Sequence, residues 1–177
     1  MGISIFQPPP IPMDKVERGH AVTASGAVEA IDDRVLSEIT QLVCQDLRVS
    51  ASLFSILHQD TQYVVAAHGS PTGAYRRKNS FSGHAIVSGE HLFFVPELLV
   101  DERFADDPWV KGDAARSRFY AAAGIRLDGK HAIGAISAID PYLRSTISLE
   151  DREAMAKAAS AATARLSQLQ FEPRCCG

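Results

Sequence analysis

Two pairs of apolar segments, each pair joined by a very short polar link, constrain the fold more than any other feature of this sequence. The first pair covers residues 51–58 and 61–68, and only Gln59 and Asp60 separate them. The second pair covers residues 117–127 and 131–139, joined by Asp128-Gly129-Lys130. Such short links, with Asp-Gly as a strong signal, are typical of β-hairpins. Because hairpins pair strands antiparallel, the sequence predicts a mostly antiparallel sheet.

Amphipathic segments flank the two hairpins. From Val35 to Leu47, apolar residues recur at spacings of three and four, which predicts a helix with one buried face, and Asp32 or Asp33 can cap its start. A second helix is predicted from Ser148, where Ser148-Leu149-Glu150-Asp151 forms a capping box with Asp at its last position, to about residue 169. Alanines make much of its apolar face thin, so another helix can approach closely. We expect these two helices to pack together.

The remaining segments define the domain limits. Residues 1–28 are rich in proline and show no clear period, so they are predicted to be an extended or poorly ordered leader. Residues 30–169 are expected to form one folded domain, and residues 170–177 a tail that holds Cys175 and Cys176. Between the hairpins we expect a polar loop over residues 69–79, a short helix over 82–88, a short strand over 91–95 and an irregular segment over 101–112.

Composition excludes several classes of function. Hydrophobic residues make up 46% of the chain, charged residues 22%, and the net charge is −3, as in an ordinary globular protein without a basic surface for nucleic acid. No apolar run approaches the roughly 20 residues of a membrane helix, so no membrane contact is predicted. Three cysteines form no disulfide framework, and the cytoplasm is the expected compartment. No histidines and cysteines stand at metal-ligand spacing, so no metal is predicted.

Five segments, in this order and at this spacing, resemble the GAF domain in the form attached to bacterial two-component sensor histidine kinases. They are Ser80-Phe81-Ser82-Gly83-His84-Ala85-Ile86, Phe94-Val95-Pro96-Glu97, Asp101-Glu102-Arg103-Phe104-Ala105-Asp106-Asp107-Pro108, Arg118-Phe119-Tyr120-Ala121-Ala122-Ala123 and Ile133-Gly134-Ala135-Ile136-Ser137-Ala138-Ile139-Asp140. The resemblance covers about residues 30–169. It implies an α/β (α+β) fold with a central, mostly antiparallel sheet, helices on both faces, a ligand cavity under the middle segment, and dimerisation through the terminal helices.

The resemblance implies a regulatory, sensory domain that binds a small ligand and signals through a homodimer or a partner such as a histidine kinase. Neither the ligand nor a cofactor follows from the sequence. A ligand-free dimerisation module is one alternative. A methionine sulfoxide reductase-like enzyme is another, but that branch uses several cysteines, and only Cys44 lies within the domain. Residues 69–125 contain no cysteine, which disfavours a covalently bound bilin. We therefore expect no enzymatic activity and no catalytic residue.

The resemblance places eight residues at the expected ligand cavity. Alternative structural roles stay open for several of them: Asp101 can cap a short helix from Glu102, Arg118 can pair with Asp101 or Asp140 instead of clamping an anion, and Trp109 can be a packed side chain instead of a lid. The predicted ligand-binding residues are Phe81, Ser82, Asp101, Phe104, Trp109, Arg118, Tyr120 and Ser137.

Overall fold

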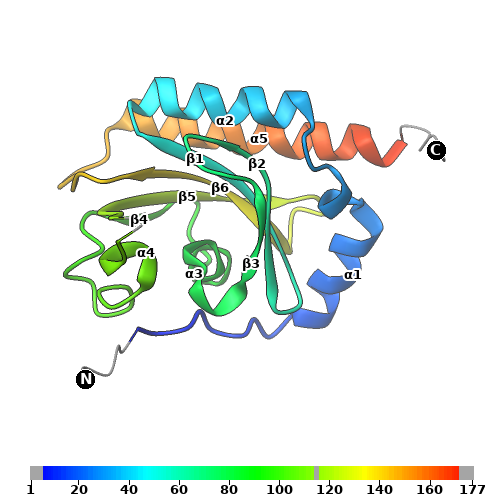
Figure 1. The fold of residues 1–177 in the computed structure, drawn as a ribbon. Coiled ribbons are helices and arrows are strands. Elements are labelled where there is room, and N and C mark those ends of the chain that lie inside the picture. Colours follow the sequence, from blue (N-terminus) through cyan, green and yellow to red (C-terminus); the bar gives the residue numbers. More distant parts are fainter. Residues whose placement is uncertain (1–5, 114–115, 172–177) are drawn as a thin grey trace.

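A six-stranded sheet lies between two unequal layers of helices in the computed structural model, which describes residues 6–113 and 116–171 (Figure 1). The strands run in the spatial order β3-β2-β1-β6-β5-β4, and every neighbouring pair is antiparallel. The predicted fold class is therefore confirmed. The strand bounds are β1 Ala51–His58, β2 Thr61–His68, β3 Gly73–Arg76, β4 Phe93–Val95, β5 Phe119–Arg126 and β6 Ala132–Asp140.

Both predicted hairpins are present, and the residues in their turns adopt the backbone conformations that such tight turns require. Gln59 adopts a left-handed conformation (φ 52°) between β1 and β2. Gly129 does the same (φ 72°) between β5 and β6, where glycine meets no steric penalty. Asp128 Oδ1 accepts hydrogen bonds from the backbone N–H groups of Lys130 (2.8 Å) and His131 (2.7 Å). The turn chemistry therefore brings β5 and β6 into register.

The first helical layer consists of α2 (Arg34–Leu47) and α5 (Leu149–Phe171), which lie side by side on one face of the sheet (Figure 1). Asp33 caps α2 by accepting a hydrogen bond from the Leu36 N–H (3.0 Å). The predicted capping box begins α5, since Ser148 Oγ accepts from the Asp151 N–H (3.0 Å). The larger hydrophobic core fills the space between these helices and the sheet, and its fully buried members include Leu36, Phe54, Ile136, Met155 and Leu166.

The second layer covers the opposite face and is more irregular. It contains α3 (Phe81–Ser88), the short α4 (Pro108–Lys111) and a 3-10 turn, η2 (Arg77–Asn79) (Figure 1). A smaller core lies beneath it, built largely from aromatic rings in edge-to-face contact. Phe81 contacts Phe104 and Tyr120, with 5.3 Å between ring centroids in each pair.

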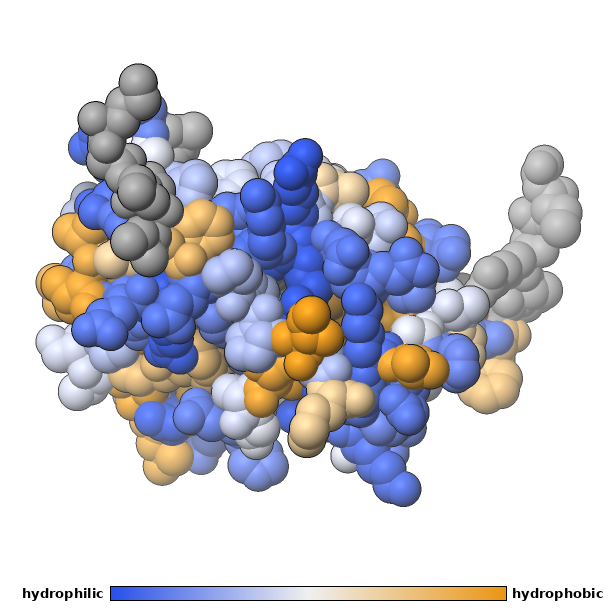
Figure 2. All heavy atoms as spheres, turned by 90° about the horizontal axis from the view of Figure 1, so that it is seen from below, coloured by the Kyte–Doolittle hydropathy of each residue, from blue (hydrophilic) through white to orange (hydrophobic). Residues whose placement is uncertain are grey.

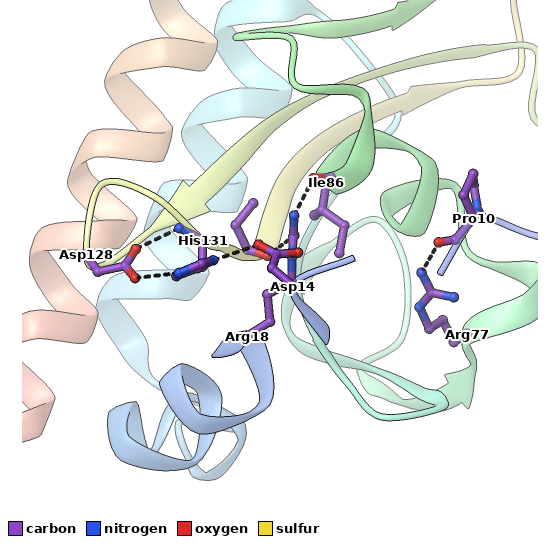
Figure 3. Close-up of polar contacts among 8 residues, drawn as sticks. Pro10, Asp14, Arg18, Arg77, Ile86, Asp128 and His131 are labelled. Atoms are coloured by element: carbon purple, nitrogen blue, oxygen red, sulfur yellow. Dashed lines mark hydrogen bonds and ion pairs between the residues drawn. The ribbon is translucent and has the colours of Figure 1, made fainter. Parts of the chain in front are cut away.

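The N-terminal region differs from the sequence expectation, because part of residues 1–28 is helical. Helix α1 (Lys15–Ser25) and a 3-10 turn, η1 (Ala27–Glu29), follow the prolines. Tertiary contacts stabilise α1 (Figure 3): Arg18 donates to the backbone carbonyls of Ala132 and Ile86, and Asp14 contacts both Arg18 and His131. These partners lie far away in the sequence, so no local period revealed the helix.

Residues 6–14 form a segment, here called the N-terminal strap, that crosses the outer side of α3 (Figure 1). Arg77 donates hydrogen bonds to the carbonyls of Pro9 (3.3 Å) and Pro10 (2.6 Å). Buried Pro9 packs against Gly83, where a Cβ atom would lie only 2.6 Å from the proline ring. The strap is thus an ordered part of the domain despite its proline content.

Two smaller differences concern the middle of the chain. The segment 69–79, expected to be a polar loop, contributes the edge strand β3 and the turn η2. Residues 102–105 form turns where a short helix starting at Glu102 had been an option. Cys175 and Cys176 lie outside the described residues.

Candidate ligand-binding pocket

A pocket of about 370 Å³ opens between the sheet and the second helical layer. This volume is at the lower end of the roughly 300–1,000 Å³ typical of small-molecule sites. Its walls come from β1, β2, β3, β5 and β6 together with α3 and α4, so segments distant in the sequence enclose one space. The lining residues are Ser50, Ala51, Leu53, Gln62, Val64, Gly69, Ser70, Pro71, Tyr75, Asn79, Phe81, Ser82, Trp109, Arg116, Ser117, Tyr120, Ile139 and Pro141.

Figure 2 shows the molecule from the side of this second layer. Hydrophobic residues appear there as separate groups among hydrophilic ones, and not as one continuous apolar area. Protein-docking surfaces are distinguished by larger contiguous apolar patches. This face therefore suits a bounded ligand site better than a broad docking surface.

Hydroxyl groups meet at the inner wall of the pocket. Ser82 Oγ and Tyr120 Oη lie 3.0 Å apart, and Ser137 also hydrogen-bonds the tyrosine hydroxyl. Burial raises the pKa of Tyr120 well above its ordinary value of 10, so the phenol stays protonated. Ser137 is fully buried behind this pair and also lies 3.4 Å from the Leu53 carbonyl. The Tyr120 hydroxyl group can therefore donate or accept a hydrogen bond with a ligand, and it carries no charge.

Gln62 supplies a second polar group deep in the pocket. Its side chain is only 8% exposed. The amide nitrogen donates to Ser55 Oγ (2.9 Å), and the residue lines the pocket. The amide oxygen is a hydrogen-bond acceptor, so Gln62 can accept a hydrogen bond from a ligand in the pocket.

Two aromatic side chains stand at the mouth. Tyr75 and Trp109 meet edge to face with 5.7 Å between centroids, and Trp109 remains 39% exposed. Asp107 positions Trp109 by accepting a hydrogen bond from its backbone N–H (2.8 Å) and is itself hydrogen-bonded by Asn79. Burial raises the pKa of Asp107 above its ordinary value, opposed by these two hydrogen bonds. The pair can contact the face or edge of a flat ligand.

The charge of the pocket comes from Arg116. This side chain is exposed at the rim, and among the described residues no carboxylate pairs with it. The lining residues include no aspartate or glutamate. The pocket as described is therefore neutral inside with one positive charge at its edge.

Four of the eight predicted residues line the pocket, namely Phe81, Ser82, Trp109 and Tyr120. Ser137 lies directly behind Tyr120 and reaches the pocket only through that hydroxyl. Phe104 is buried in the aromatic cluster against Phe81 and supports the wall from outside.

Asp101 and Arg118 are not brought to the pocket. Asp101 accepts hydrogen bonds from the Arg103 side chain (2.7 and 2.9 Å) and backbone N–H (3.0 Å), and these bonds hold the pKa of its carboxyl below the ordinary value. Arg118 donates to the Val110 carbonyl (2.9 Å) and lies 3.9 Å from Glu97. Both side chains hold loops of the second layer in place, and Arg118 pairs with neither Asp101 nor Asp140.

Sequence reasoning missed Gln62, Tyr75, Asn79 and Arg116. Gln62 was visible as a polar residue next to the apolar part of β2, and a glutamine that faces the covered side of a sheet needs a partner. Tyr75 and Asn79 belong to the segment expected to be a solvated loop. Arg116 carried no local signal, because only the folded chain brings it to the rim.

The cysteine of the described residues lies away from the pocket. Cys44 lies on α2, on the opposite face of the sheet, and burial raises the pKa of its thiol to about 11. Within the described ranges, no three His, Cys, Asp or Glu side chains gather as metal ligands. In the same part of the chain, no helix is both long and apolar enough to cross a bilayer.

No model of a known protein family matches the sequence. Among curated proteins, a cyclic di-GMP phosphodiesterase of Pseudomonas aeruginosa is 30% identical over 162 residues. The alignment covers 92% of this chain but only 27% of that relative. This chain therefore spans about a quarter of the length of that relative, and the likeness does not show its activity.

Solved structures of several functions have the same fold. The chromophore-binding domain of a bacteriophytochrome from R. palustris matches with a TM-score of 0.58 and 15% identity, over 90% of this chain and 64% of that one. The PixJ GAF-domain of Thermosynechococcus elongatus matches with 0.58 and 9%, over 92% of each chain. Free methionine-R-sulfoxide reductase of Neisseria meningitidis matches with 0.58 and 14%, over 94% and 96%. Together with the sheet order and the pocket beneath α3 and α4, these matches show that the chain has the fold of a GAF domain.

Proposed function

We propose that this chain is a regulatory, sensory module that binds a small ligand in the pocket and passes the bound state to a partner protein or a second copy, in the cytoplasm. The observation that carries the proposal is that the pocket and the core under α2 and α5 lie on opposite faces of the same strands. Leu53 of β1 lines the pocket, while the next residue, Phe54, packs into the core under α2 and α5. A ligand that shifts β1 would therefore act on the helical layer directly.

The kinds of proteins that share the fold support a sensory role. The bacteriophytochrome domain is a chromophore-binding domain, and the Pseudomonas relative is a phosphodiesterase of which this chain matches about a quarter. A histidine kinase or another signalling protein is the partner we propose. Its action would follow from movement of α2 and α5 relative to one another.

Tryptophan fluorescence tests ligand binding directly, because Trp109 is the one tryptophan in the sequence and lines the pocket. We expect a ligand that enters the pocket to change its emission and to raise the melting temperature. The Trp109→Phe variant should lose the optical signal and keep the thermal shift. A panel of nucleotides, including cyclic di-GMP, together with amino acids and aromatic acids would overturn the proposal if no compound changes either quantity.

A ligand-free dimerisation module is the second candidate, favoured by the outer surface of α2. Leu42 is 53% exposed, and Val35, two turns earlier on the same side, is also exposed. If two copies pair through this surface, Leu42→Glu should convert a dimer to a monomer in light scattering. Leu143→Glu is a matched control, because Leu143 is similarly exposed in the loop after β6. A monomeric wild type at high concentration would rule this candidate out. Ligand binding and dimerisation can both hold.

A methionine sulfoxide reductase-like enzyme is the third candidate, since reductases share the fold. The position of Cys44 argues against it, because this buried thiol faces the helical core and its raised pKa disfavours the reactive thiolate. We therefore propose a binding function without catalysis. Turnover of free methionine sulfoxide that disappears in Cys44→Ser would reverse that assignment.

A further inference from the structure

We infer that the pocket takes a one- or two-ring aromatic monocarboxylate with a hydrogen-bond donor at the end of the ring system remote from the acid. The inference deepens the proposed function and rests on it. Three features of the pocket carry it: its single charge, its aromatic walls and the amide group of Gln62 in its lining.

The sign of the ligand charge follows from Arg116. The guanidinium stands at the rim, is unpaired among the described residues, and faces a pocket whose lining includes no acidic side chain. A planar guanidinium can bind a carboxylate through two parallel hydrogen bonds. A cationic ligand would meet the one positive charge with no carboxylate to offset it. One anionic group, held at the rim where water still reaches it, fits this arrangement.

The shape of the ligand follows from the walls. Phe81 and Tyr120 line the interior, Tyr75 and Trp109 stand at the mouth, and Leu53 lies between them along the sheet. Aromatic side chains favour flat partners through stacked and edge-to-face contacts. The volume of about 370 Å³ is near the lower end of the range for small-molecule sites. One or two rings fit such a space, while a cyclic dinucleotide would have to extend far outside it.

The donor follows from Gln62. Its amide nitrogen uses one of its two N–H groups on Ser55, which fixes the amide and leaves its oxygen as an acceptor for a ligand. A ligand hydroxyl or amino group would satisfy it. The Ser82–Tyr120 hydroxyl pair on the inner wall can accept or donate a further bond. Because Gln62 is buried and Arg116 is exposed, the donor and the carboxylate must lie at different depths of the ligand.

Isothermal titration calorimetry with four related compounds tests the ligand class. They are 4-hydroxybenzoate, benzoate, the neutral 4-hydroxybenzamide and the cationic tyramine. We expect 4-hydroxybenzoate to bind most tightly, with benzoate and the amide each about tenfold weaker or more, and tyramine not to bind. Cyclic di-GMP is included as a larger anion and should not bind.

Two substitutions assign the contacts to residues. Arg116→Gln should weaken 4-hydroxybenzoate about tenfold or more and leave 4-hydroxybenzamide unchanged, while Arg116→Lys should restore part of the affinity. Arg34→Gln, the same charge change on exposed α2, should have no effect. Gln62→Leu should weaken 4-hydroxybenzoate but leave benzoate unchanged, so benzoate reports whether that variant is still folded.

The possible failures are distinguishable. If tyramine or 4-hydroxybenzamide binds as tightly as 4-hydroxybenzoate, or if Arg116→Gln has no effect, the ligand class is wrong and the proposed binding function stands. Tight binding of cyclic di-GMP would also show that the inferred ligand class is wrong, and the proposed binding function would stand. If none of the compounds binds and the broader panel also gives no thermal shift, the inference and the proposed function fall together.

Discussion

The two faces of the sheet are built from the same strands but are packed differently. The face under α2 and α5 is a continuous apolar core, in which Leu36, Phe54 and Met155 are fully buried. The face under α3 and α4 has a smaller aromatic core, and beside it a pocket with Gln62, Ser82 and Tyr120 in its walls. Long helices with regular apolar faces can close over a sheet without gaps, whereas short helices and loops leave space between them. The first face therefore supplies stability, and the second can supply binding.

The contrast is sharpest along β1, where neighbouring residues point to opposite faces. We expect Phe54→Ala to lower the free energy of unfolding by about 3–5 kcal/mol, because it opens a cavity in a filled core. Leu53→Ala should cost clearly less, since that side chain already borders open space. Urea unfolding of both variants measures the difference. Equal losses would mean that the pocket side is packed as tightly as the core.

The strap provides the next largest effect, because it covers the irregular layer from outside. In Gly83→Ala the new methyl group meets Pro9, so the strap must shift, and we expect a loss of about 1–3 kcal/mol. Tryptic cleavage after Lys15 or Arg18 should become faster. Gly19→Ala in α1 is the matched control, since nothing lies within 4 Å of its added methyl group. It should stabilise the protein by about 0.5–1 kcal/mol. Unchanged cleavage in Gly83→Ala would show that the strap is not held by this contact.

The hydroxyl pair tests how polar the pocket wall is. Tyr120→Phe keeps the ring in the aromatic cluster and removes the group that contacts Ser82 and Ser137. We expect a loss of about 1 kcal/mol, the usual net value of one buried hydrogen bond. Thermal unfolding measures it, with 4-hydroxybenzoate titrated into the same variant. A stabilised variant would indicate that the hydroxyl group is poorly satisfied in the free protein and serves a ligand.

A predicted effect of similar size lies on the filled face and depends on pH. Burial alone would raise the pKa of Asp33, but hydrogen bonds from Arg165 and from the Leu36 N–H outweigh burial and hold it below the ordinary value of 3.8. A lowered pKa stabilises the fold above the unfolded-state pKa, and this stabilisation is lost as the pH falls through the folded-state pKa. Asp33→Asn keeps an N-cap acceptor and loses the charge. We expect it to be less stable than wild type by about 1 kcal/mol at pH 7.

Chemical unfolding of wild type and Asp33→Asn between pH 7 and pH 2 checks the sign. The difference should stay constant down to about pH 4 and shrink below it. Asp33→Ala, which also loses the cap, should remain less stable than wild type even at pH 2. A wild-type advantage that grows on acidification would contradict the assignment.

Much of the fold was predictable because its signals are local. The turn Asp128-Gly129 and the link Gln59-Asp60 identified both hairpins, and Asp33 and Ser148 marked the starts of α2 and α5. Half of the predicted site was also placed at the pocket, because Phe81, Ser82, Trp109 and Tyr120 belong to segments that carry the family resemblance. Arg118 could not be separated from Arg116 by sequence. Both arginines precede the same strand. Only the fold shows that Arg118 is bonded to the Val110 carbonyl while Arg116 lines the pocket.

The sequence by itself determined the strands, the two long helices and the antiparallel pairing, since turn chemistry, capping and hydrophobic period act over a few residues. Only the tertiary structure decided that the N-terminal region is ordered and which residues line the pocket. Helix α1 and the strap depend on contacts of Asp14, Arg18 and Arg77 with partners up to 117 residues away. Gln62 and Arg116 acquire a role only because β2 and the loop before β5 meet around one space. Such long-range contacts leave no periodic pattern in the sequence. The family resemblance therefore indicated the cavity and four of its lining residues, while only the fold added Gln62 and Arg116.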